Sequence, residues 1–305
     1  MKTRFLLHTG LLALMIWMLA GCRQFVEDYE VSPNAPLDAT PALLLPSAQV
    51  YVFNVYNSNA SRIVSIFMQQ SAGLDRQYLA HNRYIILSSD VDPDWSNAYE
   101  GALMDLKLLI EKADAERRPI YGGIGRILRA MTLGLLTDCF GDIPYSEALQ
   151  GKGSPNPRYD SQEAIYRTIQ TELDRAIELL ESQPDPSIQG QNPGKQDLIH
   201  NGDVNKWLIT AWTLKARYAN HLSKLDAAGS AQQALAAVEK ALELGASPAS
   251  DALARYGAEL SARNPWAMFV TQRGDLGMGG FLVDTMWNSI DPRIFDYAFP
   301  NAADQ

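Results

Sequence analysis

Three short stretches of this chain place aromatic rings beside amide and charged side chains, a combination suited to binding a polar ligand. A flat ring stacks on one face of a sugar, while amides and charged groups hydrogen-bond its hydroxyls. We therefore take the following residues as candidate ligand contacts: Arg83, Tyr84, Trp95, Asn97, Tyr99, Trp266, Arg273 and Asp275. An alternative interpretation applies to Trp95 and Tyr99, because residues four apart can both lie on the buried face of one helix.

The stretch Thr137–Leu149 raises the question of a reactive cysteine, because Cys139 stands there among carboxylates. Its spacing continues the apolar stripe of a predicted helix, where a buried thiol is usually inert packing. Gly141 is expected to stop that helix and Pro144 to fix the exit of the chain, with Asp142 accepting hydrogen bonds from amides of the turn. We therefore interpret the stretch as a helix terminus.

Other patterns that would indicate catalysis or a metal centre are lacking in the sequence. The histidines after residue 21 are His81, His200 and His221, and none has the partner spacing of a zinc site. No Gly-x-Ser-x-Gly elbow is present, and the glycine-rich stretch 274–280 lacks the Lys-Ser/Thr ending of a phosphate loop. Carboxylates are numerous, so a glycoside hydrolase is kept as a third hypothesis. We expect no enzyme, no metal and no cofactor. Calcium, whose oxygen ligands need no fixed spacing outside an EF-hand, is left undecided.

The first residues read as a lipoprotein signal peptide over 1–21, with basic residues before an apolar run. The run ends in Leu19-Ala20-Gly21-Cys22, which resembles the lipobox of bacterial lipoproteins, so Cys22 is the predicted lipidation site. A plain signal peptide that happens to precede a cysteine is the alternative. Residues 22–40 are acidic and then rich in proline and asparagine, which predicts a lipidated, extended tether. A membrane-attached protein follows from these features.

The charge of the chain excludes one class of partner. Without residues 1–21 it holds 24 Lys and Arg against 35 Asp and Glu, a formal charge of −11. Nucleic acid requires a basic face on its partner, so we expect no nucleic acid. With Cys22 acylated, Cys139 has no partner for an internal disulfide.

Helical periodicity dominates the remaining chain and predicts a mainly all-α fold. The predicted helices are Pro41–Ser71 with a break around 57–59, Trp95–Ala115, Tyr121–Cys139, a helix capped by Asp160 and running to Leu180, Val204–Leu222, and Ala231–Leu244 capped by Ser230. Short loops and alanine-rich faces opposite large aromatics suggest tetratricopeptide-like pairs, with ordinary bundle packing as the alternative. A brief strand is predicted over Tyr84–Leu87. Three long segments are predicted to be irregular and functional: Gly141–Tyr159, Gln183–Gly202 and Ser261–Asp291.

Several motifs occur in a fixed order along the chain. They are Glu27-Asp28-Tyr29 before Ser32-Pro-Asn-Ala-Pro36, Trp95-x-x-x-Tyr99-x-Gly101, Ala130-x-x-x-Gly134 leading to Phe140-Gly-Asp-Ile-Pro-Tyr-Ser-Glu-Ala148, Asp197-Leu-Ile-x-Asn-Gly-Asp203 leading to Trp207, and Asp291-Pro-Arg293. With the lipobox at Cys22 they resemble the SusD/RagB family of nutrient-binding outer-membrane lipoproteins of Bacteroidetes.

The resemblance implies a SusD-like α-helical nutrient-binding domain over 41–305, held by lipid at the cell surface of the outer membrane. It also implies a glycan or peptide ligand, delivered to a SusC-like TonB-dependent transporter without catalysis. The alternative is a helical-repeat scaffold that recognises another protein and has no nutrient site of its own. Family members continue beyond the Asp-Pro-Arg motif, whereas this chain stops at Gln305, so the domain is expected to be incomplete at its C-terminus.

Overall fold

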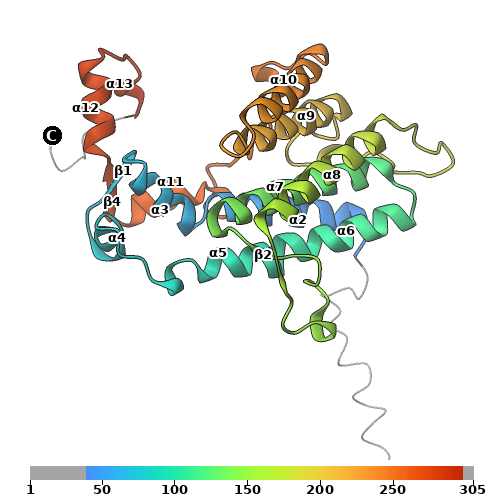
Figure 1. The fold of residues 1–305 in the computed structure, drawn as a ribbon, viewed down its shortest axis with the longest axis horizontal. Coiled ribbons are helices and arrows are strands. Elements are labelled where there is room, and N and C mark those ends of the chain that lie inside the picture. The colour runs from blue at the N-terminus through green and yellow to red at the C-terminus, as the bar shows by residue number, and fades with distance from the viewer. Residues whose placement is uncertain (1–38, 298–305) are drawn as a thin grey trace, which may run out of the picture. The chain divides into compact units, whose positions relative to one another are not determined.

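Helices make up most of the computed structural model, which describes residues 39–297. The predicted signal peptide, Cys22 and nearly all of the predicted tether lie outside these residues. The helices are α2 (Pro41–Tyr56), α3 (Asn59–Phe67), α4 (Arg76–His81), α5 (Asp92–Ser96), the π-helix η2 (Asn97–Leu103), α6 (Met104–Ala115), α7 (Pro119–Phe140), α8 (Gln162–Glu181), α9 (Val204–His221), α10 (Ala227–Glu243), α11 (Pro265–Gln272), α12 (Gly280–Asn288) and α13 (Ile294–Tyr297). The all-α prediction is confirmed (Figure 1).

Two short antiparallel pairs of strands join segments of the described chain. Strand β1 (Ser71–Gly73) pairs with β4 (Leu276–Met278), and β2 (Ile143–Pro144) pairs with β3 (Tyr159–Asp160). The predicted strand at Tyr84–Leu87 is not formed. This run has no strand partner and its side chains are exposed.

The core lies where α7 packs along α8 and α6, and α9 packs along α8 and α10 (Figure 1). Trp207 and Tyr218 of α9 and Ile124 and Leu128 of α7 are almost wholly buried there. Gly134 is needed for the fit, because a Cβ atom at this position would lie 2.2 Å from the hydroxyl oxygen of Tyr218. A glycine in the middle of a helix lowers its stability, so its use here reflects the close approach of the two helices.

The predicted helix Trp95–Ala115 is continuous but irregular, since η2 forms a π-helical turn between α5 and α6. Gly101 lies in this turn, and a Cβ atom there would be 2.3 Å from a ring carbon of Tyr51 on α2. The glycine of the Trp95 motif therefore lets α2 cross closely. The predicted break near residues 57–59 is also confirmed, between α2 and α3.

Two helix starts differ from the predictions. Ser161 caps α8 by accepting a hydrogen bond from the Ala164 amide, while the predicted cap Asp160 binds amides of another turn. Helix α10 begins four residues early because Asp226 caps it, so Ser230 lies inside the helix. In both cases the competing residue offers an equivalent side-chain acceptor, and sequence pattern does not rank the two.

The largest apolar side chains of α10 do not lie on the face that packs. Ala237 and Ala241 are buried, whereas Leu235, Val238 and Leu242 are exposed by 60%, 41% and 62%. Small side chains let α10 approach α9 closely, as α-helical pairs with short interaxial distances require. The larger side chains are left on the outer surface.

Candidate functional site

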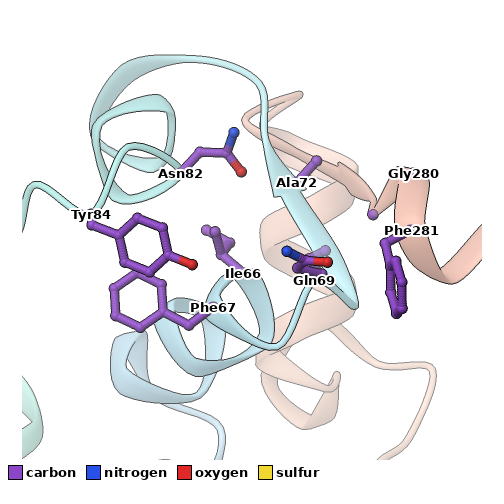
Figure 2. Close-up of a pocket in the computed structure, with 10 residues that line it drawn as sticks. Ile66, Phe67, Gln69, Ala72, Asn82, Tyr84, Gly280 and Phe281 are labelled. Atoms are coloured by element: carbon purple, nitrogen blue, oxygen red, sulfur yellow. The ribbon is translucent and has the colours of Figure 1, made fainter.

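A pocket of about 380 Å³ opens where the end of α3, strand β1, the turn after α4 and the start of α12 meet (Figure 2). Its lining combines aromatic rings with amides: Ile66, Phe67, Gln69, Ser71, Ala72, Asn82, Tyr84, Gly279, Gly280 and Phe281. We call it the aromatic pocket. Its size is within the range of small-ligand sites.

The pairing of β1 with β4 brings the two walls of the aromatic pocket together, since Ala72 lies opposite Gly277. Two glycines permit this approach. A Cβ atom at Gly73 would lie 1.8 Å from the carbonyl oxygen of Tyr78, and one at Gly279 would lie 2.1 Å from the carbonyl oxygen of Gln69. Because both neighbours are backbone atoms, they cannot move aside as a flexible side chain would.

The rings of Phe67 and Tyr84 stack on one side of the pocket, with centroids 4.8 Å apart and planes 25° apart. Phe281 lies on the other side, and the amides of Gln69 and Asn82 lie between them in the view of Figure 2. Tyr84 and Phe281 are 69% and 65% exposed, so each ring has surface open to a ligand. Exposed rings beside amides can hold the faces and hydroxyls of a sugar.

Two residues of the aromatic pocket have left-handed backbone conformations, which are unfavourable for side chains with a Cβ atom. The φ angle is 58° at Gln69 and 61° at Tyr84. Both follow the ends of helices, at positions that glycine commonly fills. Tyr84 is held there by its amide, which donates to the His81 carbonyl at 2.8 Å. Backbone strain of this kind is often found at functional sites, which agrees with the choice of this pocket as the candidate.

One candidate stretch, Arg83 and Tyr84, lies at the aromatic pocket. Tyr84 lines it and Arg83 is the exposed neighbour in the chain. Four other residues of the aromatic pocket were not predicted from the sequence: Phe67, Gln69, Asn82 and Phe281. Asn82 adjoins the predicted stretch and Phe67 precedes a pair of glutamines, which were usable signals. Phe281 offered none.

The second stretch lies along α5 and η2. Trp95 packs its ring on Tyr99 with centroids 4.7 Å apart and meets Phe140 edge-on at 5.2 Å. The Tyr99 hydroxyl donates to the carbonyl of Pro144 at 2.8 Å, and burial raises the pKa of Tyr99. Asn97 is half-buried beside them. These contacts are those of the packed helix face that we gave as the alternative interpretation.

The third stretch supports the β1–β4 pair. Asp275 is buried between two arginines, with its carboxylate 2.8 Å from Arg76 and 3.0 Å from Arg273. Trp266 is half-buried and donates its indole N–H to the Ser61 hydroxyl at 2.9 Å. The predicted irregular segment that contains this stretch, 261–291, is wrong in part, because α11, β4 and α12 form within it.

The Phe-Gly-Asp-Ile-Pro block is architecture, as predicted, but Cys139 is not buried. It is exposed at the end of α7, where the stripe leaves the core. Partial desolvation of the thiol by nearby side chains, with the charges of Asp138 and Asp94, still raises the pKa of Cys139. Gly141, with φ of 76°, ends the helix as predicted. Asp142 accepts from the Gln162 amide at 2.8 Å, in the first turn of α8.

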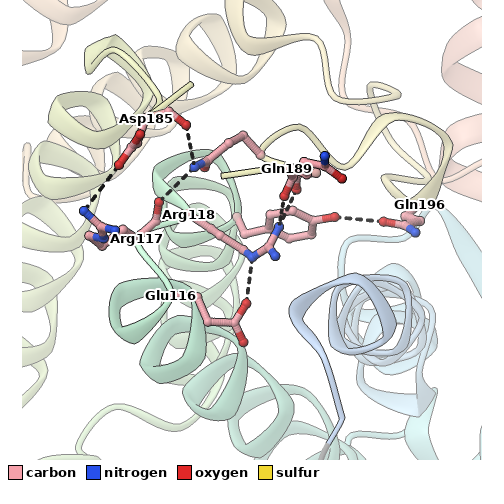
Figure 3. A network of polar contacts seen from close by, with 9 residues as sticks. Glu116, Arg117, Arg118, Asp185, Gln189 and Gln196 are labelled. Atoms are coloured by element: carbon pink, nitrogen blue, oxygen red, sulfur yellow. Dashed lines mark hydrogen bonds and ion pairs between the residues drawn. The ribbon is translucent and has the colours of Figure 1, made fainter. Parts of the chain in front are cut away.

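The segment 183–202 has little helix, and polar contacts fix it against the corner between α6 and α7 (Figure 3). Arg118 donates to Glu116 at 2.7 Å and to the carbonyl oxygens of Gln189 and Gly190 at 3.0 and 2.6 Å. Tyr121 donates to Gln196 at 2.8 Å. Arg118 and Tyr121 thus already have hydrogen-bond partners within the chain. This segment therefore leaves fewer polar groups free for a ligand than the aromatic pocket does.

The chain is similar to proteins of known family and known structure. The sequence pattern of the SusD-like proteins, described as starch-binding and associating with the outer membrane, matches residues 33–305. Similar solved structures include a SusD/RagB family protein from Bacteroides thetaiotaomicron (TM-score 0.72, 24% identity, 84% of this chain and 53% of that one). Others are a chitin-binding protein (0.71, 24%, 84% and 54%) and a SusD homologue from Bacteroides uniformis (0.61, 21%, 82% and 53%).

The chain thus spans about half the length of these structures. A search of the curated proteins finds no match. Within residues 39–297, none of the helices combines the length and the apolar character needed to cross a bilayer.

Proposed function

The chain belongs to the SusD-like family, and from this premise we propose that it binds an oligosaccharide nutrient in the aromatic pocket. The observation that carries the proposal is the exposed stack of Tyr84 on Phe67 beside the amides of Gln69 and Asn82. The stack holds the Tyr84 ring in place before ligand arrives, which lowers the entropy lost on binding. Each sugar ring has an apolar face for an aromatic and hydroxyls for the amides.

We further propose that the protein is a surface lipoprotein, anchored by lipid on Cys22, that delivers its ligand to a SusC-like TonB-dependent transporter. Family membership supports the outer-membrane location, and the lipobox supports the anchor. Delivery requires that the ligand leave again, so a moderate affinity suits the task. No chemical change of the ligand is part of this function.

The test is binding of malto-oligosaccharides and chito-oligosaccharides to the full chain, measured by calorimetry. We expect Tyr84→Ala to weaken binding about tenfold or more, as loss of one stacking ring would. Tyr159→Ala is the matched control, because Tyr159 is 65% exposed and lies outside the pocket. Equal affinity in Tyr84→Ala and the wild type would remove the pocket from the function. New reducing ends in the incubation would indicate a hydrolase instead.

Two further variants test the other predicted contacts. Trp95→Ala and Trp266→Ala are expected to weaken binding of long oligosaccharides if these stretches extend the site. Short oligosaccharides, which the aromatic pocket alone can hold, should then bind as before.

A protein-binding scaffold is a second candidate function, favoured by the exposed Leu235, Val238 and Leu242 on α10. Apolar side chains on one helix face are the anchors that helix-recognising partners use. Leu235→Ser with Leu242→Ser would abolish association with a partner under this function and leave oligosaccharide binding unchanged.

A further inference from the structure

A second pocket, of about 440 Å³, lies between α9 and the segment that follows α10, and the proposed oligosaccharide site does not include it. One wall is a face of α9 on which Thr210, Thr213 and Arg217 are successive neighbours. The segment 246–252 forms the opposite wall, and Met131 of α7 contributes to the lining. We call it the α9 pocket.

Two opposite charges that have no hydrogen-bond or ion-pair partner among the described residues line the α9 pocket. The Arg217 guanidinium lies 6.0 Å from the centroid of the Tyr218 ring. Arg217 on α9 and Asp251 on the opposite wall are both exposed. Among the described residues neither side chain makes a hydrogen bond or an ion pair, so the two lie farther apart than the 4.0 Å reach of an ion pair. Most other arginines of this helical body that make polar contacts pair with a carboxylate, for example Arg129 with Glu172 at 2.5 Å. A cation and an anion that line one cavity without an ion-pair partner can be bridged by a ligand that carries both charges.

The hydroxyl groups of the α9 pocket are acceptors toward a ligand, because their protons are already used. Thr210 donates to the Lys206 carbonyl at 2.9 Å, Thr213 to the Ile209 carbonyl at 2.8 Å, and Ser250 to the Ser247 carbonyl at 2.7 Å. A hydroxyl has two lone pairs. Thr213 keeps both, whereas Thr210 shares a hydrogen bond of 3.0 Å with His200 and Ser250 accepts from the Ser247 amide at 3.0 Å, so each of these two keeps one. The pocket therefore offers the donors of one guanidinium and several acceptors, so its ligand must bring one anionic group and several N–H or O–H donors.

The wall 246–252 is fixed before any ligand binds. Gly245, with φ of 88°, reverses the chain after α10, and the Ala246 amide donates to the Ala241 carbonyl at 3.0 Å. The Ser247 amide then donates to the Ser250 hydroxyl at 3.0 Å, and the Ser250 amide donates to the Ser247 carbonyl at 2.8 Å. A pocket with a preformed wall binds with less loss of entropy than a mobile loop does.

The apolar part of the lining distinguishes two kinds of ligand. Met131, Ile209 and Leu214 are aliphatic, and the lining has no aromatic ring. The pocket therefore offers a sugar no aromatic ring on which to stack. The aliphatic side chain of a ligand could pack against Met131, Ile209 and Leu214. We infer that the α9 pocket binds a zwitterionic α-amino acid with an aliphatic side chain, its carboxylate on Arg217 and its ammonium on Asp251.

Calorimetry with leucine tests the assignment on the full chain. Arg217→Gln and Asp251→Asn should each weaken leucine binding about tenfold or more, the loss expected for one charge-assisted contact. The controls with the same charge changes are Arg167→Gln on α8 and Glu239→Gln on α10, which are exposed and lie outside the pocket. They should bind leucine as the wild type does. Thermal melts of all four variants show whether each is folded.

Ligand analogues separate a direct contact from an indirect effect. N-acetyl-leucine lacks the ammonium, so it should bind the wild type weakly and lose nothing more in Asp251→Asn. Leucinamide lacks the carboxylate, so it should also bind the wild type weakly, and its affinity should not fall further in Arg217→Gln. The assignment is overturned if leucine at about 10 mM gives no binding, or if each analogue loses affinity again in its matched variant. Oligosaccharide binding in the aromatic pocket should be the same in both variants.

Discussion

The indole N–H of Trp207 donates to the carboxylate of Asp197 at 2.7 Å, and both side chains are completely buried. Asp197 also accepts from the Gln49 side chain at 2.7 Å and from the amides of Ile199 and Gly202. One carboxylate thus ties α2, α9 and the end of the 183–202 segment together. The acidic residue that opens the Asp-Leu-Ile motif is a structural node.

We predict that Asp197→Ala lowers the free energy of unfolding by about 3 kcal/mol or more, because Trp207 and Gln49 would keep buried donors without acceptors. Urea denaturation measures the change. Asp203→Ala is the comparison, since Asp203 only caps α9 and should cost about 1 kcal/mol. Similar losses in the two variants would contradict the role given to Asp197.

Gly73 gives a prediction that links stability to the aromatic pocket. Gly73→Ala would place a methyl group 1.8 Å from the Tyr78 carbonyl oxygen, so β1 must move from α4. We expect a loss of about 2 kcal/mol, as for other overpacked sites, together with weaker oligosaccharide binding. Gly274→Ala is the control, because a Cβ atom there meets nothing within 4 Å. Thermal melts measure the stability of the two variants and calorimetry measures their affinity for oligosaccharide.

Acid should weaken the hairpin that follows α7. Burial raises the pKa of Asp160, but hydrogen bonds from the amide and hydroxyl of Ser146 and from the Tyr145 amide outweigh it, and the net pKa is lowered. A lowered carboxyl pKa in the folded state stabilises the protein above the unfolded value near 4, and this stability is lost as pH falls through the folded value. The melting temperatures of wild type and Asp160→Asn should therefore differ by a constant amount above about pH 5 and converge in acid. A difference in melting temperature that grows as the pH falls would contradict a lowered pKa for Asp160.

Cys139 should be accessible yet slow to react. Partial desolvation and the charges of Asp138 and Asp94 raise the pKa of the Cys139 thiol, so less thiolate is present near pH 8 than for an ordinary cysteine. We expect alkylation by iodoacetamide, followed by mass spectrometry of the Cys139 peptide, to reach half its maximal rate above about pH 8.5. Asp138→Asn should speed the reaction at pH 8, whereas Asp142→Asn, which removes a carboxylate bonded to Gln162, should not.

The helices could be predicted from the sequence because their signals are local. The periodicity of α7 and α9 depends on residues three or four apart, and Gly141 ends α7 where its backbone angle requires glycine. Competition between near-equivalent caps explains the errors at α8 and α10. Pattern alone does not show which apolar side chains of α10 pack, and it is Ala237 and Ala241, the smallest of them, that are buried.

Most of the aromatic pocket could not be predicted, because its walls come from distant parts of the chain. Strands β1 and β4 have three residues each and show no alternation of apolar and polar side chains. Without that pairing nothing in the sequence brings Phe281 near Phe67. Tyr84 could be named in advance because an arginine and an aromatic ring stand together in the chain. Its stacking partner could not.

The pairing of β1 with β4 also sets an order of events during synthesis. Strand β1 leaves the ribosome about 200 residues before β4, and closing so large a loop is slow compared with forming the helices between them. Helices α6 to α10 can dock first, from contacts close in the chain. The aromatic pocket is then the last part of the described chain to be completed. Until β4 arrives, a nascent chain can already be folded in its helical body and still lack this pocket.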